Sequence, residues 1–324
     1  MNKRKLAVFL GKKVLTISIM LFFAVFITFF LMRVTGDPAE LIAGPLAKEA
    51  DIERIRIEYG LDRPIYEQFV TYFTKVMTGD FGYSLKWGRP VFQVVTERLG
   101  TSLTLSLSAQ VISLVFGVLL GTYSVKKRGK WQSETSSIIS LVLYATPVFL
   151  IAMILMYVFG MYLRLFPISG AVSLRGDPSQ GIFYVLDVLW HAVLPITALS
   201  CWYGAIFFRV TRASVSEVLN SNFMLVARSK GISENTLYFK HALRNAILPV
   251  IALAGLYMGS SFVGALMTET VFGWPGIGRL MYDSILARDA NVTSTILILG
   301  SLSVIVASSI ADLIIFLLDP RVRS

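Results

Sequence analysis

The sequence is poor in charged residues, cysteine and histidine. Only 15% of its 324 residues are charged and 55% are hydrophobic, whereas about a quarter of the residues in ordinary soluble domains are charged. This hydrophobic content excludes an intrinsically disordered chain, and the single cysteine, Cys201, excludes an internal disulfide framework. The two histidines, His191 and His241, lie on separate segments and are not expected to share a metal ion. Composition therefore predicts a membrane protein without a metal site.

Common nucleotide-binding and catalytic motifs are also missing. The chain contains no GxxxxGK[ST] phosphate-binding loop, no HExxH zinc motif and no GxSxG nucleophile motif. Neither a nucleotide site nor a common hydrolase site is predicted. We therefore expect this chain to have no catalytic residues and to bind no cofactor itself.

Six hydrophobic stretches are long enough to cross a bilayer, which takes about 20 residues. They are Val14–Met32, Thr101–Val125, Thr135–Leu163, Leu186–Phe208, Ala246–Thr268 and Asn291–Leu318. Pro147 predicts a kink in the third stretch. The first is too long for a signal peptide and has no small-residue cleavage site before Arg33, so it is interpreted as a retained anchor. The pattern predicts an all-α polytopic membrane protein with six transmembrane helices.

Basic residues are distributed unevenly among the segments that join these stretches. If both termini are cytoplasmic, the inner segments hold 17 of the 30 lysines and arginines, and nine of the others lie in the long segment 33–100. Long segments report poorly on topology. The bias therefore favours cytoplasmic N- and C-termini, and it explains the net charge of +10 without a nucleic-acid partner.

The sequence divides along these lines into four parts. They are the N-terminus with the first span (1–32), an outer helical insert (33–100), the remaining spans (101–318) and a cytoplasmic tail (319–324). Within the insert, one helix is predicted from Lys48 to Tyr59 and another begins after Pro64. The insert is either a lid on the outer ends of the spans or a docking surface for an external partner.

The inner segment 209–245 contains a short isolated helix. Asn222 is predicted to cap it and Gly231 to end it, so that it runs from Asn222 to Lys230. Phe223 and Met224 are expected to be exposed on it, at a cost in water unless they are covered. Either a partner protein or the lipid surface covers them.

This inner segment resembles the EAA loop of ATP-binding-cassette (ABC) import permeases, in the oligopeptide, dipeptide and nickel branch. The resemblance begins with Ala227–Gly231, followed nine residues later by His241–Asn245. Further matching motifs stand in the same order as in that branch: Gly36-Asp37-Pro38-Ala39, Tyr59-Gly60-Leu61-Asp62-Arg63-Pro64, Gly79-Asp80-Phe81-Gly82, Glu269 to Gly278, and Leu318-Asp319-Pro320-Arg321. Together they cover nearly the whole chain.

The chain departs from the wider EAA pattern at four positions. Leu225 and Val226 replace the first Glu and Ala, while His241 and Arg244 replace Ile and Pro. Ala227, Gly231 and Leu243 match the pattern. Such variation is usual in the peptide branch.

The resemblance implies a type I ABC importer permease fold and a set of partners. These are a second homologous permease, two cytoplasmic ATPases that bind ATP and Mg²⁺, an extracytoplasmic solute-binding protein, and the lipid bilayer of the plasma (inner) membrane. The coupling residues toward the ATPases would be Asn222, Phe223, Met224, Ala227, Arg228, Lys230 and Gly231.

Small and polar residues in the spans are candidates for a permease seam and for a transport path. Gly255, Gly259 and Gly264 permit close helix approach, either within the chain or against the second permease. The candidates for the path or its outer gate are Ser106, Ser113, Ser260, Glu269, Trp274 and Pro275. The serines either line a wet passage or pack between helices. Asp312 near the end of the sixth span serves either helix packing or gating, and His191 with Asp187 forms a polar pair rather than a ligand site.

The predicted function is import of di- or oligopeptides as one permease subunit of an ATP-driven, binding-protein-dependent system. Nickel chelates and oligosaccharides are alternative substrates of the same machinery. A passive channel, a membrane enzyme and an interaction scaffold are the alternatives from other classes.

Overall fold

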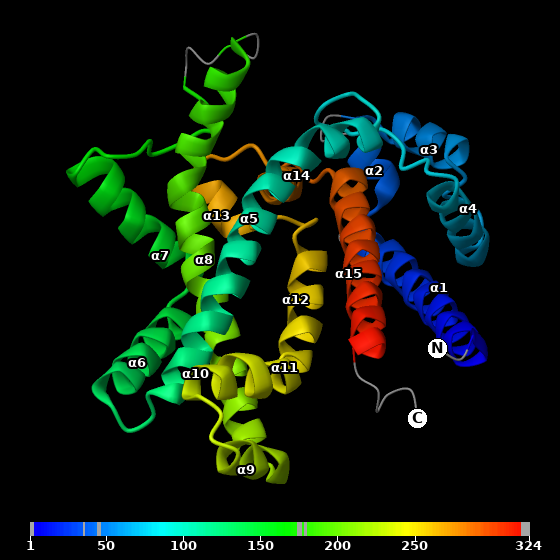
Figure 1. Cartoon of the computed structure of the whole chain (residues 1–324). Helices are drawn as coiled ribbons and strands as arrows, with labels where there is room; N and C mark the ends of the chain where they lie inside the picture. Colours follow the sequence, from blue (N-terminus) through cyan, green and yellow to red (C-terminus); the bar gives the residue numbers. More distant parts are fainter. Residues whose placement is uncertain (1–2, 35, 44–46, 174–176, 178–179, 319–324) are drawn as a thin grey trace.

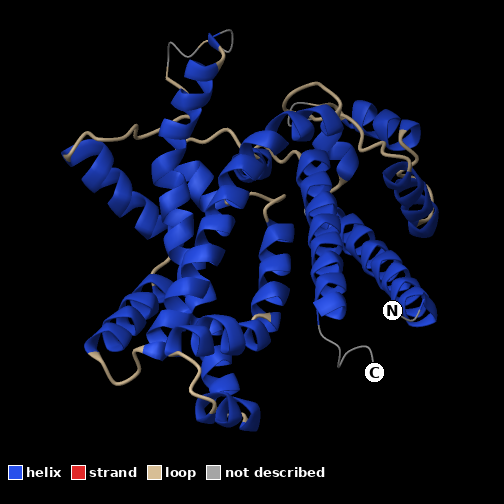
Figure 2. Ribbon diagram, viewed as in Figure 1, coloured by secondary structure: helices blue, strands red, loops and turns tan. Residues whose placement is uncertain are grey.

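The computed structural model describes residues 3–34, 36–43, 47–173, 177 and 180–318. Across these residues the regular structure is helical, apart from an isolated bridge between Tyr83 and Pro90 (Figure 2). Four helices in the described part are long and apolar enough to cross a membrane, or six spans if each of two bent helix pairs counts as one. The predicted all-α membrane fold is confirmed. The predicted tail 319–324 lies outside the described residues.

Four of the six spans are unbroken helices. They are α1 (Lys3–Val34), α5 (Val91–Lys126), α8 (Ile182–Leu219) and α15 (Ala290–Leu318). Figure 1 shows α5 beside α8 and α1 beside α15. Gly117 and Gly121 on α5 permit the close approach of α5 to α8. A Cβ on Gly117 would lie 2.6 Å from Cβ of Phe207, and one on Gly121 would lie 2.8 Å from the backbone oxygen of Phe208.

The third span is broken rather than kinked, which corrects the continuous stretch Thr135–Leu163. Its halves are α6 (Trp131–Ala145) and α7 (Val148–Leu155) with the π-helix Met156–Tyr162, and they meet at 103°. Thr146 and Pro147 both have extended backbone, with ψ of 127° and 137°. Proline disfavours the helical conformation at the residue before it. Two successive extended residues then turn the chain much further than a proline kink alone.

The fifth span begins and ends earlier than the predicted Ala246–Thr268. It is formed by α10 (Glu234–Thr236), the π-helix Leu237–Ala242, α11 (Leu243–Ala246) and, after a 58° bend, α12 (Leu248–Ser260). The 13 residues of α12 are only about 20 Å long at 1.5 Å per residue, so the bent pair is needed to cross the bilayer. After α12 the chain turns through Gly264, with φ of +78°, into α13 (Leu266–Val271).

The outer insert contains α2 (Pro38–Ala43), α3 (Glu49–Glu58) and α4 (Ile65–Met77). Helices α3 and α4 lie where the sequence predicts helices, whereas α2 was not predicted. Helix α3 is followed by Gly60, with φ of +66°. Helix α4 packs against α1 through Phe69, whose ring centroid lies 5.2 Å from Phe29 and 5.5 Å from Phe26. Helix α4 of the insert therefore packs on the side of the helix bundle, against α1.

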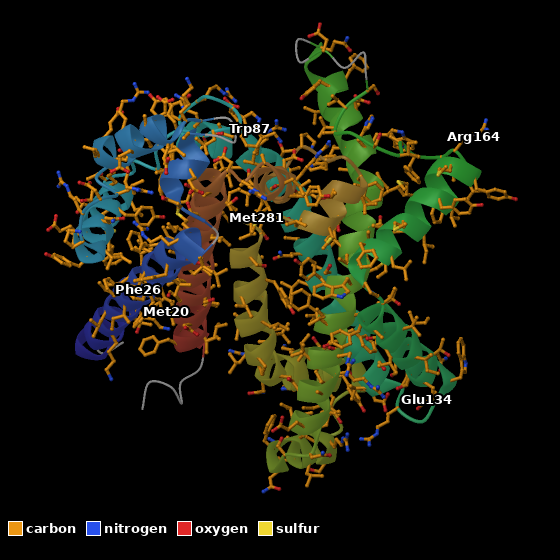
Figure 3. All side chains as sticks on the ribbon, turned by 180° about the vertical axis from the view of Figure 1, so that it is seen from behind. Met20, Phe26, Trp87, Glu134, Arg164 and Met281 are labelled. Carbon is orange, nitrogen blue, oxygen red and sulfur yellow. The ribbon has the colours of Figure 1, made fainter. Side chains whose placement is uncertain are left out.

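The two ends of the molecule differ in the elements they carry. Helices α2 and α3 and the helix α14 (Ile277–Leu286) lie at one end, whereas α9 (Asn222–Ser229) lies at the other (Figure 1). The start of α1 and the end of α15 lie toward the α9 end. Figure 3 shows Trp87 and Met281 at the outer-insert end, where both pack against the apolar cluster of Val91, Ile277 and Val292.

An ion pair joins the ends of α1 and α15. The Lys13 ammonium binds the Asp312 carboxylate, with both side chains partly buried. This contact accounts for an acidic residue in the last span and supports the packing alternative for Asp312.

Neutralising Asp312 is expected to weaken this helix contact. Asp312→Asn and Lys13→Gln should each lower the free energy of unfolding, and the double variant should lose less than the sum, with a coupling of about 1 kcal/mol. Thermal unfolding of the purified chain and its three variants in detergent gives the four stabilities of this double-mutant cycle. Strictly additive losses would show that the pair does not stabilise the α1–α15 contact.

Candidate functional site

The short helix of the inner segment is α9, and Ser221 rather than Asn222 stands at its N-cap position. Ser221 has extended backbone, with φ of −78° and ψ of 150°, while Asn222 is already the first helical residue. The predicted cap at Asn222 is therefore wrong by one residue. Gly231, with φ of +70°, follows the helix as predicted.

Met224 faces the interior of the chain, which corrects its predicted exposure. It is fully buried in an apolar cluster with residues from three spans. The cluster comprises Val125 at the end of α5, Val215 on α8, and Leu237, Ala242 and Ala246 of the fifth span. Ala227, one turn after Met224, packs against the same cluster. Because both residues lie on one helical face, α9 is attached to the ends of several spans.

The other faces of α9 carry exposed apolar and basic side chains. Phe223 is 43% exposed, Leu225 59% and Val226 54%. Arg228 and Lys230 are exposed at the end of this helix. Leu225 and Val226 were not among the predicted coupling residues, although their place where the EAA pattern has Glu and Ala could have drawn attention to them. The exposed surface is thus apolar at its start and positively charged at its end.

The glycines of α12 contact α15 of the same chain. A Cβ on Gly255 would lie 2.3 Å from Cβ of Ala311, and one on Gly259 would lie 2.4 Å from Cα of Val304. Gly264 lies beside Glu269, Gly278 and Ser102. These contacts favour the internal-packing alternative for the three glycines, because the close approach that they permit is used within the chain, and the seam against a second permease stays a prediction.

The candidate path serines are engaged in helix packing in this conformation. Ser106 and Ser113 are buried, and the Ser113 hydroxyl donates to the backbone oxygen of Ser200 on α8 at 3.1 Å. The Ser260 hydroxyl, which is partly buried, donates to the backbone oxygen of Tyr257 in its own helix at 2.7 Å. Packing between helices therefore describes Ser106 and Ser113 better than a wet passage, whereas the hydrogen bond of Ser260 lies within α12.

Glu269 lies in a buried site at the outer-insert end, which is inconsistent with lining an open path. Its carboxylate accepts from the Ser102 hydroxyl at 2.7 Å and from the backbone N–H groups of Arg279 at 3.0 Å, Ala265 at 3.3 Å and Gly278. Ser102 in turn accepts from the Ile277 N–H at 2.6 Å. Burial raises the pKa of the Glu269 carboxyl, and these donors partly offset the increase.

Trp274 and Pro275, two of the predicted outer-gate residues, belong to the turn between α13 and α14. The Trp274 side chain is completely buried, and its indole N–H donates to the Thr101 oxygen at 3.1 Å. Gly276 contacts Glu269, because a Cβ there would lie 2.4 Å from the carboxylate. The predicted outer-gate residues are therefore brought together, but as a closed and buried turn that fastens α13 and α14 to α5.

Asp289 is a second buried carboxylate that the sequence analysis missed. It accepts from the Ser84 hydroxyl at 2.5 Å and the Lys86 N–H at 3.1 Å, both in the outer insert, and from the Val292 N–H at 3.3 Å. An Asp immediately before an apolar helix is a typical N-cap signal. Asp289 thus caps α15 and anchors the insert to it.

His191 and Asp187 form the predicted polar pair, with Nδ1 of His191 3.3 Å from Oδ1 of Asp187. Asp187 also accepts from the Ser173 hydroxyl at 2.7 Å. No group of three or more potential metal ligands occurs within the described residues.

Known proteins resemble this chain over nearly its whole length. Residues 113–324 match the family described as "Binding-protein-dependent transport system inner membrane component", and residues 6–108 match the N-terminal part of such membrane components. A probable peptide ABC transporter permease of Sinorhizobium fredii (strain NBRC 101917 / NGR234) is 37% identical over 314 residues, covering 97% of this chain and 98% of the relative. A glutathione transport system permease of Escherichia coli (strain K12) is 35% identical over 300 residues, or 93% of each chain.

A solved structure shows the same fold. The MetNI methionine ABC transporter in an inward-facing conformation aligns with a TM-score of 0.57 at 14% identity, covering 70% of this chain and 97% of that chain. Both family matches and both relatives agree with the resemblance in the EAA-like segment. This chain belongs to the family of binding-protein-dependent transport system inner membrane components.

Proposed function

We propose that the chain is one permease subunit of an ATP-driven importer of di- or oligopeptides. The names of the two relatives, a peptide permease and a glutathione permease, support the peptide class. The bound solute would come from an extracytoplasmic binding protein, and the membrane would be the plasma (inner) membrane. The chain itself would not hydrolyse ATP.

The observation that carries the proposal is the two-sided structure of α9. Met224 buries one face in a cluster that includes the ends of α5 and α8, while Phe223, Leu225 and Val226 remain exposed. Exposed apolar side chains on a short helix are costly unless a partner covers them. A groove on an ATPase would cover them, and its acidic residues would pair with Arg228 and Lys230.

The family resemblance supplies the remaining partners of the proposal. A second similar permease would complete the passage, and two cytoplasmic ATPases holding ATP and Mg²⁺ would move the two α9 helices when they close. The proposal has α9 and both termini in the cytoplasm, an orientation supported by the 17 basic residues that the inner segments would then hold. Closure would then tilt α8 and α12 through the buried cluster around Met224.

Reconstituted vesicles test the proposal. The complete complex with its binding protein is expected to accumulate radiolabelled glutathione or a tripeptide only when ATP is inside, on the side of α9. A nickel chelate and a maltooligosaccharide serve as competing substrates. Uptake without ATP would indicate a passive channel and overturn the proposal, and ATP-driven uptake of the sugar or chelate alone would overturn the peptide assignment.

A further inference from the structure

A cavity of about 470 Å³ lies where α5, α6 and α8 meet, near the α9 end of the bundle. It is separate from α9 and from the buried Glu269 site. Its lining combines three arginines with small polar and apolar side chains: Val125, Arg128, Ser137, Leu141, Phe208, Arg209, Arg212, Ala213 and Ser216.

The cavity carries three positive charges without a compensating acid. Arg128, Arg209 and Arg212 form no ion pair with any described residue, and no carboxylate is among the lining residues. The Arg209 guanidinium stacks over the Tyr144 ring, 4.6 Å from its centroid. Glu134, labelled on the first turn of α6 in Figure 3, does not line the cavity. An anion is therefore the complementary ligand.

The cavity lies at the depth of a membrane interface. The apolar run of α8 ends at Phe208, and Arg209 and Arg212 follow directly. On the adjoining surface of α6, Ile138, Leu141 and Val142 are each more than half exposed. Acyl chains at this depth would cover such a surface, so a ligand with an anionic group above an apolar part fits both the cavity and the adjoining face of α6.

The walls of the cavity are fixed by hydrogen bonds. The Ser140 hydroxyl on α6 donates to the Ala205 oxygen on α8 at 3.2 Å, and the Ser133 and Ser124 hydroxyls of α6 and α5 lie 3.2 Å apart. The short half-span α6 is thereby held against both neighbours. The arginines consequently surround a space that exists without the ligand.

We propose that this cavity binds the headgroup phosphate of an anionic phospholipid, whose acyl chains lie along the exposed apolar surface of α6. Arginine suits this role because its planar guanidinium donates two parallel hydrogen bonds to phosphate. Basic pockets between membrane helices bind anionic headgroups in this way. An acidic surface of an ATPase fits the charges but not the lipid-facing wall of α6.

The test compares lipid binding by the purified full-length chain and its variants. Native mass spectrometry after incubation with equal amounts of dioleoyl phosphatidylglycerol and dioleoyl phosphatidylcholine should retain one phosphatidylglycerol per chain. Replacing Arg128, Arg209 and Arg212 by Gln should weaken retention about fivefold per arginine, since each contributes about 1 kcal/mol. Leu141→Trp, which puts a bulkier side chain in the cavity wall and keeps the charge of the cavity, should weaken retention as well.

The matched control changes three basic residues on the same side that do not line the cavity. Lys130, Lys240 and Arg244 are exposed, and replacing them by Gln removes the same charge. Equal losses in the two triple variants would overturn the site in favour of diffuse attraction. Inorganic phosphate that displaces the lipid at millimolar concentration would reassign the cavity to a free anion. Retained lipid together with lost ATPase binding in the arginine variant would reassign it to the protein partner.

Discussion

Phe223→Asp is expected to abolish ATP-driven uptake by the reconstituted complex while leaving the isolated permease folded. Phe223 is 43% exposed and does not belong to the buried cluster around Met224, so the substitution leaves that cluster intact. Truncating an anchoring aromatic residue at an interface typically costs about 2–4 kcal/mol of binding. ATPase binding should therefore weaken by about 30-fold or more. Pull-down of the ATPases and peptide uptake into vesicles measure the two effects.

The control for this experiment adds the same charge elsewhere in the inner segment. Asn245 is exposed on α11, so Asn245→Asp adds the same charge outside α9, with loss of the hydrogen bond that the Asn245 amide donates to the backbone oxygen of His241. It should leave ATPase binding within a factor of about two. Wild-type uptake by Phe223→Asp would remove α9 from the coupling pathway. Met224→Asp is not an equivalent test, because it would bury a carboxylate in the apolar cluster and unfold the segment.

The sequence predicts the helical class and the number of apolar stretches correctly because both depend on local composition. Each span needs only enough consecutive apolar residues to cross the bilayer. In the insert, the backbone preferences of Gly60 and Pro64 mark where one helix ends and the next begins. The shapes of the third and fifth spans were missed. The break in the third span depends on the backbone angles at Thr146, and the early end of the fifth span is followed by the turn at Gly264. Hydropathy records neither feature.

The orientation of individual side chains was harder to predict than the helices that carry them. On α9, Phe223 and Met224 are adjacent and both apolar, yet one is exposed and the other buried. The eight residues of this helix give too little periodicity to identify its inward face. The packing partner of Gly255 and Gly259 could not be predicted either, because small residues indicate a close helix contact but do not identify the helix that makes it.

The buried cluster around Met224 gives α9 a direct connection to the bent fifth span. Leu237 and Ala242, two of its members, bound the π-helix that precedes α11 and the 58° bend. π-Helical segments often occur at functional sites within helices. A displacement of α9 would therefore reach α12 through packed side chains, and α12 would pass it to α15 through the contacts at Gly255 and Gly259.

Glu269 fixes the opposite end of α5, and its replacement by Gln is expected to destabilise the chain. The carboxylate uses both oxygens to accept from the Ser102 hydroxyl and from backbone N–H groups. An amide presents an NH₂ group in place of one oxygen and leaves at least one buried donor unpaired, at about 1–3 kcal/mol for each. Glu134→Gln on the exposed start of α6 is the matched control and should change thermal unfolding little.

The same substitution should alter how stability depends on pH. Because burial raises the pKa of Glu269 in the folded chain, the folded state keeps a proton that the unfolded state releases between the ordinary and the raised pKa. The contribution of Glu269 to stability is therefore fully present below the ordinary pKa of a glutamate and is lost as pH rises through the folded value. Thermal unfolding of the purified chain across this window should show the decline in the wild type and in Glu134→Gln, but not in Glu269→Gln. An identical pH profile in all three proteins would mean that Glu269 keeps an ordinary pKa and that its hydrogen-bond donors balance the effect of its burial.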